Sequence, residues 1–280
     1  DPESQRLAYA SSFSHQNETA EPGYYSVFLD TYQVKAELTS TKRGALHRYT
    51  FPESKEAGFI LDLDYSLQRQ INSEMEIEVI SETEICGHKK TMYWAFDQSI
   101  NFYAKFSKPF TYTLITDSVT MDNGKRLPTS KVLLHFETTN HEEILVKVGV
   151  SAVDIDGARK NVESEITDWD FDKVRQNARN AWNKYLSKID ITTQDKNDKT
   201  IFYTALYHSA ISPNLFTDAD GRYLGMDLQV HQGDTINPIY TVFSLWDTFR
   251  ALHPLMTIID PDLNTQFINS LIKKQPLKLR

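Results

Sequence analysis

The chain has 280 residues, of which 40% are hydrophobic and 24% are charged, a composition typical of folded globular domains. It carries 30 Lys and Arg against 38 Asp and Glu, so the net charge of −8 offers no positive field that would attract nucleic acid. No apolar run approaches the ~20 residues of a membrane helix, and the first residues, Asp1–Ser4, lack the basic and apolar regions of a signal peptide. The single cysteine, Cys86, excludes an internal disulfide and is expected to be a buried apolar side chain.

From about residue 24 to residue 153, apolar and polar residues alternate with the period of two that is typical of β-strands. Turn signals separate the runs, among them Pro22-Gly23, Cys86-Gly87 and Asn123-Gly124. Many short strands without intervening helices predict an antiparallel β-sandwich, which we assign to residues 1–160.

The apolar period changes to that of a helix beyond Trp169. The spacing predicts a linker helix within residues 161–195, with Asp170 or Asp172 as its N-cap. Further helices are expected at three places: from about Thr200 to Ile211, from about Phe243 to Leu252, and from Pro261 onward. Residues 196–280 are therefore expected to form a helical domain.

The stretch Asp218–Tyr240 lies between two of these helices and has no clear periodicity. It exceeds the usual connection length, so it is predicted to be either a functional lid or a small hairpin. Asp154, Asp156 and Gly157 are similar to part of a calcium-binding loop but lack its terminal Glu, which favours a solvated turn.

The densest group of chemically useful side chains lies in Phe243–Arg250. On a helix, Trp246 and Arg250 would share a face, and Arg250 lies three residues beyond Asp247. An aromatic ring, a carboxylate and a guanidinium together suit a sugar, because C–H faces pack on rings while charged groups bind hydroxyls. The alternative, which spacing alone favours, is a surface ion pair between Asp247 and Arg250 beside a core Trp246.

The same stretch resembles the signature of glycoside hydrolase family 92, through Phe243-Ser244-Leu245-Trp246-Asp247-Thr248. Further segments are similar to the sandwich domain of that family, namely Phe13–Glu18, Pro22–Val27, Lys35–Thr39 and His47–Pro52. The resemblance covers nearly the whole chain.

This resemblance implies a calcium-dependent, inverting exo-α-mannosidase that removes terminal mannose from glycans. Its β-sandwich would pack on an (α/α)6 barrel that starts within residues 196–280, with the site between the two. Asp247 would hydrogen-bond mannose hydroxyls in the −1 subsite, and Trp246 and Arg250 would shape it. The family's catalytic acid and base and its calcium ligands come from later in the barrel. They are expected beyond Arg280, so no catalytic residue and no complete calcium site are expected in this chain.

The family's glycine-rich opening segment is missing before Asp1, and the residues from Lys274 to Arg280 do not resemble its continuation. We therefore expect a truncated chain that is inactive alone, from a bacterial enzyme of the periplasm, the cell surface or the medium. Two alternatives remain: a carbohydrate-binding or interaction module in which only the sandwich functions, and another sugar enzyme of the same plan, such as a disaccharide phosphorylase. The Ser-Leu-Trp-Asp-Thr stretch argues against the module, and the sandwich matches argue against the phosphorylase.

Overall fold

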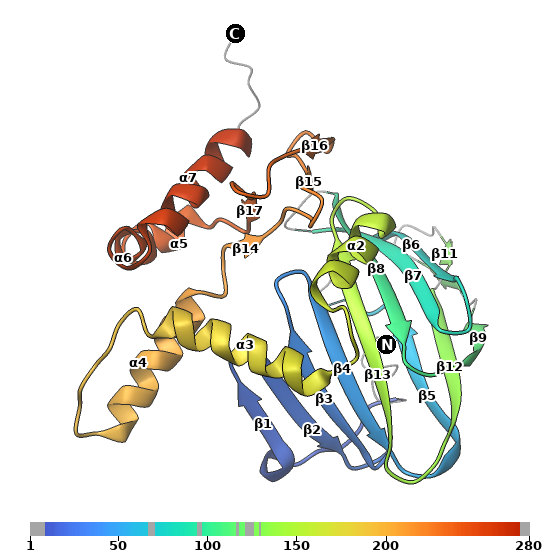
Figure 1. The fold of residues 1–280 in the computed structure, drawn as a ribbon. Helices are drawn as coiled ribbons and strands as arrows, with labels where there is room; N and C mark the ends of the chain where they lie inside the picture. Colours follow the sequence, from blue (N-terminus) through green and yellow to red (C-terminus); the bar gives the residue numbers. More distant parts are fainter. Residues whose placement is uncertain are drawn as a thin grey trace.

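The computed structural model describes residues 9–66, 71–93, 97–115, 118–120, 126–128 and 130–274. The chain forms a β-rich N-terminal part and a helical C-terminal part (Figure 1). The turn expected at Asn123-Gly124 and the tail that ends at Arg280 lie outside the described residues.

The N-terminal part is built on an antiparallel sheet of eight strands, preceded by the short 3-10 helix η1 (His15–Asn17). In spatial order the strands are β1 (Glu18–Glu21), β2 (Tyr24–Leu29), β3 (Val34–Ser40), β4 (Gly44–Phe51), β13 (Glu142–Ser151), β8 (Gln98–Phe106), β7 (Glu84–Met92) and β6 (Ile71–Val79). Strand β1 is one edge of this sheet, and β13 returns from far along the chain to pair with β4 and β8.

A smaller sheet covers one face of the large one and completes the predicted sandwich. It consists of β5 (Ser54–Asp62), β12 (Lys131–Thr138) and β9 (Thr111–Ile115), and β10 (Ser118–Thr120) pairs with β11 (Arg126–Pro128) nearby. Between the sheets, the ring of Phe59 lies 5.5 Å from that of Phe106 and 5.6 Å from that of Phe136. This aromatic core confirms the antiparallel sandwich.

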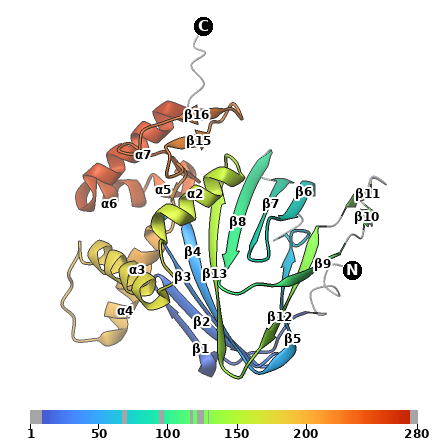
Figure 2. The same cartoon turned by 45° about the vertical axis from the view of Figure 1, so that its right-hand side comes forward.

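Two helices, α2 (Ile155–Glu165) and α3 (Phe171–Leu186), cover the other face of the large sheet (Figure 2). Ala158 and Val162 of α2 are fully buried against Leu46 and Tyr103 in a second apolar cluster. The helix approaches so closely that a Cβ atom on Gly149 would lie 2.0 Å from the carbonyl oxygen of Ala158. Glycine is therefore required at that position of β13.

Aspartates begin both helices. Asp170 accepts a hydrogen bond from the amide of Lys173 at 2.9 Å, which confirms the predicted N-cap of α3. Asp154 accepts one from the amide of Gly157 at 2.6 Å and caps α2. The solvated turn predicted at Asp154, Asp156 and Gly157 is thus wrong, because these residues start a helix that docks on the sheet.

The remaining elements form the C-terminal part. They are α4 (Lys196–Ser209), β14 (Asn214–Leu215), β15 (Arg222–Leu224), β16 (Val230–Gln232), β17 (Tyr240–Thr241), α5 (Leu245–Thr248), α6 (Leu252–Ile259) and α7 (Pro261–Lys274). The irregular stretch Asp218–Tyr240 contains the hairpin β15–β16, one of the two predicted alternatives. Within the described residues, no helix has the length and apolar character needed to cross a membrane.

One helix predicted from the sequence, Phe243–Leu252, is instead two. Helix α5 ends at Thr248 and α6 begins at Leu252, with Ala251 outside helical geometry between them. Pro254 explains the break, because it has no amide proton for the carbonyl of Arg250 and its ring would clash with that carbonyl in a continuous helix. In the first turn of α6 the same proline is tolerated.

Candidate active-site segment

We use the name signature segment for residues 241–250, which connect β17 to α6. Val242 has a φ of 61°, which is unusual for a β-branched residue and marks a constrained backbone just before α5. The hydroxyl of Ser244 donates to Oδ2 of Asp247, and Thr248 Oγ1 donates to the carbonyl of Ser244 at 2.8 Å. These bonds lie within the single turn of α5.

The structure places the three predicted site residues on the surface of this segment. Trp246 has 85% of its surface exposed, and Asp247 and Arg250 are exposed as well. Asp247 and Arg250 form no ion pair in the described part of the chain, and the guanidinium of Arg250 lies 5.2 Å from the ring centre of Phe249. The alternative of an Asp247–Arg250 pair beside a core Trp246 is therefore wrong.

The expectation that Trp246 and Arg250 share a helical face is also wrong, because α5 ends before Arg250. Trp246 and Asp247 therefore lie in the helical turn α5, whereas Arg250 lies in the connection between α5 and α6. Pro254 is the sequence signal that could have revealed this arrangement, because a proline inside a helical pattern breaks the helix before it.

Helix α7 packs against the signature segment and the residue before it through the ring of Phe267. This ring is 4% exposed and packs edge-on against Tyr240 at 5.0 Å and Phe243 at 5.8 Å. The buried hydroxyl of Ser270 accepts a hydrogen bond from the amide of Tyr240 at 3.0 Å. Both ends of the strained backbone at Val242 are therefore anchored on one helix.

A chain of buried and half-buried bonds links the signature segment to the sandwich. Thr217 Oγ1 accepts from the amide of Ile239 at 2.6 Å, and the carbonyl of Thr217 accepts from Nε of Arg43 at 2.8 Å. Arg43 lies between β3 and β4 and pairs with Glu165 of α2 at 2.7 Å. The sandwich thus fixes the strand that leads into the segment.

Asp218 continues this anchorage next to Thr217. Its carboxylate accepts hydrogen bonds from Ser151 at 2.6 Å and Asn161 at 2.8 Å, inside the interface of α2 and β13. Burial raises the pKa of Asp218, while the bonds from Ser151 and Asn161 act in the opposite direction. The group has its hydrogen-bond partners, so a structural role accounts for it.

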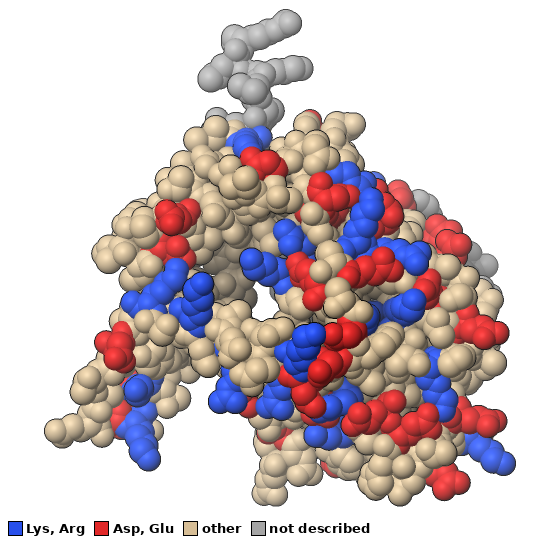
Figure 3. Space-filling model, viewed as in Figure 1, with Lys and Arg blue, Asp and Glu red and all other residues tan. Residues whose placement is uncertain are grey.

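Charged and apolar surfaces are unevenly distributed around the segment. Acidic and basic side chains are mixed over the surface of the sandwich and α3, whereas the face around α6 and α7 carries few charged side chains (Figure 3). Large exposed apolar side chains on that part include Trp246, Phe249, Ile258, Ile268 and Ile272.

Comparison with known proteins accounts for both halves of the chain. A model of the glycosyl hydrolase family 92 N-terminal domain matches residues 1–151, and one of the family 92 catalytic domain matches residues 157–278. The chain belongs to glycoside hydrolase family 92. The sandwich and the helices after it therefore correspond to the two domains of this family, as the resemblance implied.

Solved structures of family 92 enzymes agree with this assignment. An α-mannosidase from Bacteroides thetaiotaomicron, 34% identical, superposes with a TM-score of 0.86 over 94% of this chain and 36% of its own. An inverting mannosidase from the same species, 26% identical, gives a TM-score of 0.80 over 94% of this chain and 35% of its own. The large sheet followed by helices matches the β-sandwich and helical barrel of these structures.

A protein described as an uncharacterized secreted glycosidase, from Arthroderma benhamiae, is 24% identical in an alignment 263 residues long that covers 76% of this chain and 32% of that protein. The family 92 chain thus spans about a third of the length of the relatives that it matches.

The described residues of the family 92 chain contain no group of three or more His, Cys, Asp or Glu side chains that could hold a metal ion. The described residues therefore do not supply the cluster of carboxylate oxygens that a calcium site needs. Cys86 is 2% exposed, as expected, and burial raises the pKa of its thiol. The location of the catalytic acid, base and calcium ligands beyond Arg280 stays a prediction.

Proposed function

We propose that the chain is part of an inverting, calcium-dependent exo-α-mannosidase that releases terminal α-linked mannose from glycans. Support comes from the family and from its solved relatives, one of which is an inverting mannosidase and another an α-mannosidase in complex with mannoimidazole. In this proposal, the signature segment contributes to substrate binding and the metal ligands belong to the rest of a complete catalytic domain.

The observation that carries the proposal is the exposed Trp246 beside a carboxylate with unused acceptor capacity. Ser244 is the polar side-chain partner of Asp247 in the described residues and bonds only its Oδ2. Oδ1 can then accept hydrogen bonds from neighbouring mannose hydroxyls, while the ring of Trp246 packs on the apolar C–H face of the sugar. Arg250 would donate to sugar oxygens at the edge of the same surface.

Inversion needs a general acid and a general base separated by roughly 6.5–9.5 Å, so that a water fits beside the anomeric carbon. We assign neither group to the residues of this chain. The contribution of Asp247 is to orient the mannose ring, since bonds that tighten in the transition state lower the barrier.

We also propose that the enzyme acts outside the cytoplasm, in the periplasm, at the cell surface or in the medium. The secreted description of the Arthroderma relative supports an extracellular place of action.

The proposal is tested with two proteins: this 280-residue chain, and a polypeptide in which it continues into a complete family 92 catalytic domain. Each is incubated with an α-linked mannobiose and calcium while proton NMR follows the anomeric signals. The complete enzyme is expected to release β-mannose first, with the reaction abolished by a chelator, and the short chain to release none above a blank. Initial release of α-mannose would contradict inversion, and chelator-sensitive turnover by the short chain would contradict its inactivity.

A further inference from the structure

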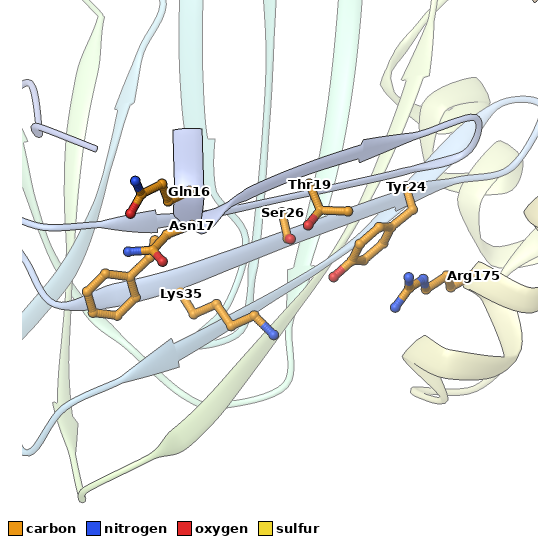
Figure 4. A pocket seen from close by; sticks show the side chains of 8 residues that line it. Gln16, Asn17, Thr19, Tyr24, Ser26, Lys35 and Arg175 are labelled. Carbon is orange, nitrogen blue, oxygen red and sulfur yellow. The ribbon is translucent and has the colours of Figure 1, made fainter. Parts of the chain in front are cut away.

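A second surface of the molecule has the character of a binding site. It is an open pocket of about 590 Å³ on β1, β2 and β3, closed at one end by α3 (Figure 4). This volume lies within the ~300–1,000 Å³ range of small-molecule sites. In both ribbon views the pocket's strands lie below α3 and the signature segment lies above it (Figures 1 and 2), so the two sites are separate.

Strand register explains the hollow. Ser26 of β2 is paired with Thr19 of β1 on one side and with Glu37 of β3 on the other. The larger side chains of Tyr24 and Phe28 flank Ser26 two residues away on the same face of β2. A small hydroxyl between two aromatic residues therefore leaves a depression at the edge of the sheet.

Four polar side chains that line this depression make no hydrogen bond within the described residues: Gln16, Asn17, Thr19 and Ser26. Two are carboxamides and two are hydroxyls, so each offers both a donor and an acceptor. Ser26 is 7% exposed, and its hydroxyl can bond to water or to a ligand that enters the open pocket.

The two cations at the rim are already matched by carboxylates. Lys35 lies 3.2 Å from Glu37, and Arg175 lies 3.3 Å from Glu21 with its guanidinium 3.4 Å from the ring centre of Tyr24. In the view of Figure 4, Lys35 and Arg175 reach toward the Tyr24 hydroxyl from β3 and α3. An anion would have to compete with these carboxylates, whereas an uncharged ligand would leave both pairs intact.

We propose that this pocket binds a neutral hexose unit of a glycan, away from the signature segment. Sugar hydroxyls donate and accept in equal measure, which matches two carboxamides and two hydroxyls better than a phosphate or carboxylate does. The ring of Phe28, opposite Lys35 in the register, offers an apolar surface for a sugar C–H face. Such a site would hold a glycan on the sandwich independently of any cleavage.

The choice of mannose as the probe rests on the proposed function. The 280-residue chain is titrated with an α-linked mannobiose at millimolar concentrations, and in parallel with inorganic phosphate, while calorimetry or NMR reports binding. Asn17→Ala combined with Thr19→Ala is expected to weaken mannobiose binding about tenfold, since two hydrogen bonds are removed. Ser26→Leu, which fills the depression, is expected to abolish it.

Asn180→Ala, an exposed change on α3 outside the pocket, is the matched control and is expected to leave the affinity unchanged. Circular dichroism and thermal melting check that each variant is folded. If Ser26→Leu does not fold, the double variant of Asn17 and Thr19 provides the test.

Absence of mannobiose binding, or binding of phosphate alone, would overturn the proposal. So would binding lost in Asp247→Ala but kept in the pocket variants, because the sugar would then sit at the signature segment. Mannose release by the complete enzyme is a separate readout, so failure here leaves the proposed function standing.

Discussion

At the scale of single residues, Glu37 joins the sandwich to its covering helix. It is 3% exposed, accepts from the Tyr24 hydroxyl at 2.7 Å, and pairs with Nε of Arg48 at 2.9 Å. Arg48 in turn stacks 4.3 Å from the ring centre of Phe171, the first residue of α3. Burial alone would raise the pKa of Glu37, but the bonds from Arg48, Tyr24 and Lys35 outweigh it and lower that pKa to about 2.

This shift predicts an acid-sensitive contribution to stability. The folded pKa of Glu37 lies below its ordinary value of 4.5, so the stabilisation is present above pH 4.5 and is lost as the pH falls toward 2. Glu37→Gln is expected to lower the free energy of unfolding at pH 7 by about 3 kcal/mol, because Arg48 loses its buried partner. Urea denaturation at several pH values measures both effects.

The exposed Glu56→Gln is the control for that substitution and is expected to leave stability unchanged at every pH. If the difference in free energy of unfolding between Glu37→Gln and the unsubstituted protein is the same at pH 2 as at pH 7, the Glu37 carboxylate is not the source of the acid sensitivity.

Single residues also show which structural features could be predicted from the sequence. The N-cap at Asp170 was predictable, because a cap and the apolar spacing after it are local signals. Asp154 was missed because α2 buries few apolar positions, chiefly Ala158 and Val162, which is too sparse a pattern to mark a helix. The pairing of Glu37 with Arg48 could not be predicted, because it depends on the register of β3 and β4 and not on the spacing of the two residues in the sequence.

At the scale of elements, α7 positions the signature segment through one ring. Phe267→Ala is expected to cost about 3–5 kcal/mol, because it opens a cavity against Tyr240, Phe243 and His253. Hydrogen exchange should increase in residues 239–274 while the sandwich strands stay protected, since the ring contacts of Phe267 are with Tyr240, Phe243 and His253. Ile272→Ala, a change of an exposed side chain on the same helix, is the control.

Equal loss of protection in the sandwich and in residues 239–274 would show that the two parts unfold together, against a local role for Phe267. The elements themselves were largely predictable, with helix α7 starting at Pro261 as expected. The exceptions are α2, whose start was predicted to be a turn, and α5–α6, where a continuous apolar pattern concealed the break that Pro254 imposes.

At the scale of the whole molecule, the apolar period of strands ends near residue 153 and that of helices begins beyond Trp169. This change separates a sandwich from helices, as the sequence predicted. What could not be read is the docking between the two parts. The path from Arg43 through Thr217 to Ile239 joins residues far apart in the chain, which no local pattern encodes. The roles of Trp246, Asp247 and Arg250 in binding stay a prediction.

The most direct test of the account is Asp247→Ala in the complete family 92 enzyme, with kcat/KM and Tm measured on the same variant. Charge-assisted hydrogen bonds contribute roughly 1.5–3 kcal/mol each, so kcat/KM should fall at least about tenfold per bond lost, at about 1.36 kcal/mol per decade. The Tm should change little, because Asp247 is exposed and bonds only to the hydroxyl of Ser244 among the described side chains. Asp190→Ala, an exposed aspartate outside the segment, should alter neither quantity. A lowered Tm with full activity in the folded enzyme would contradict the account and make Asp247 a structural residue of α5.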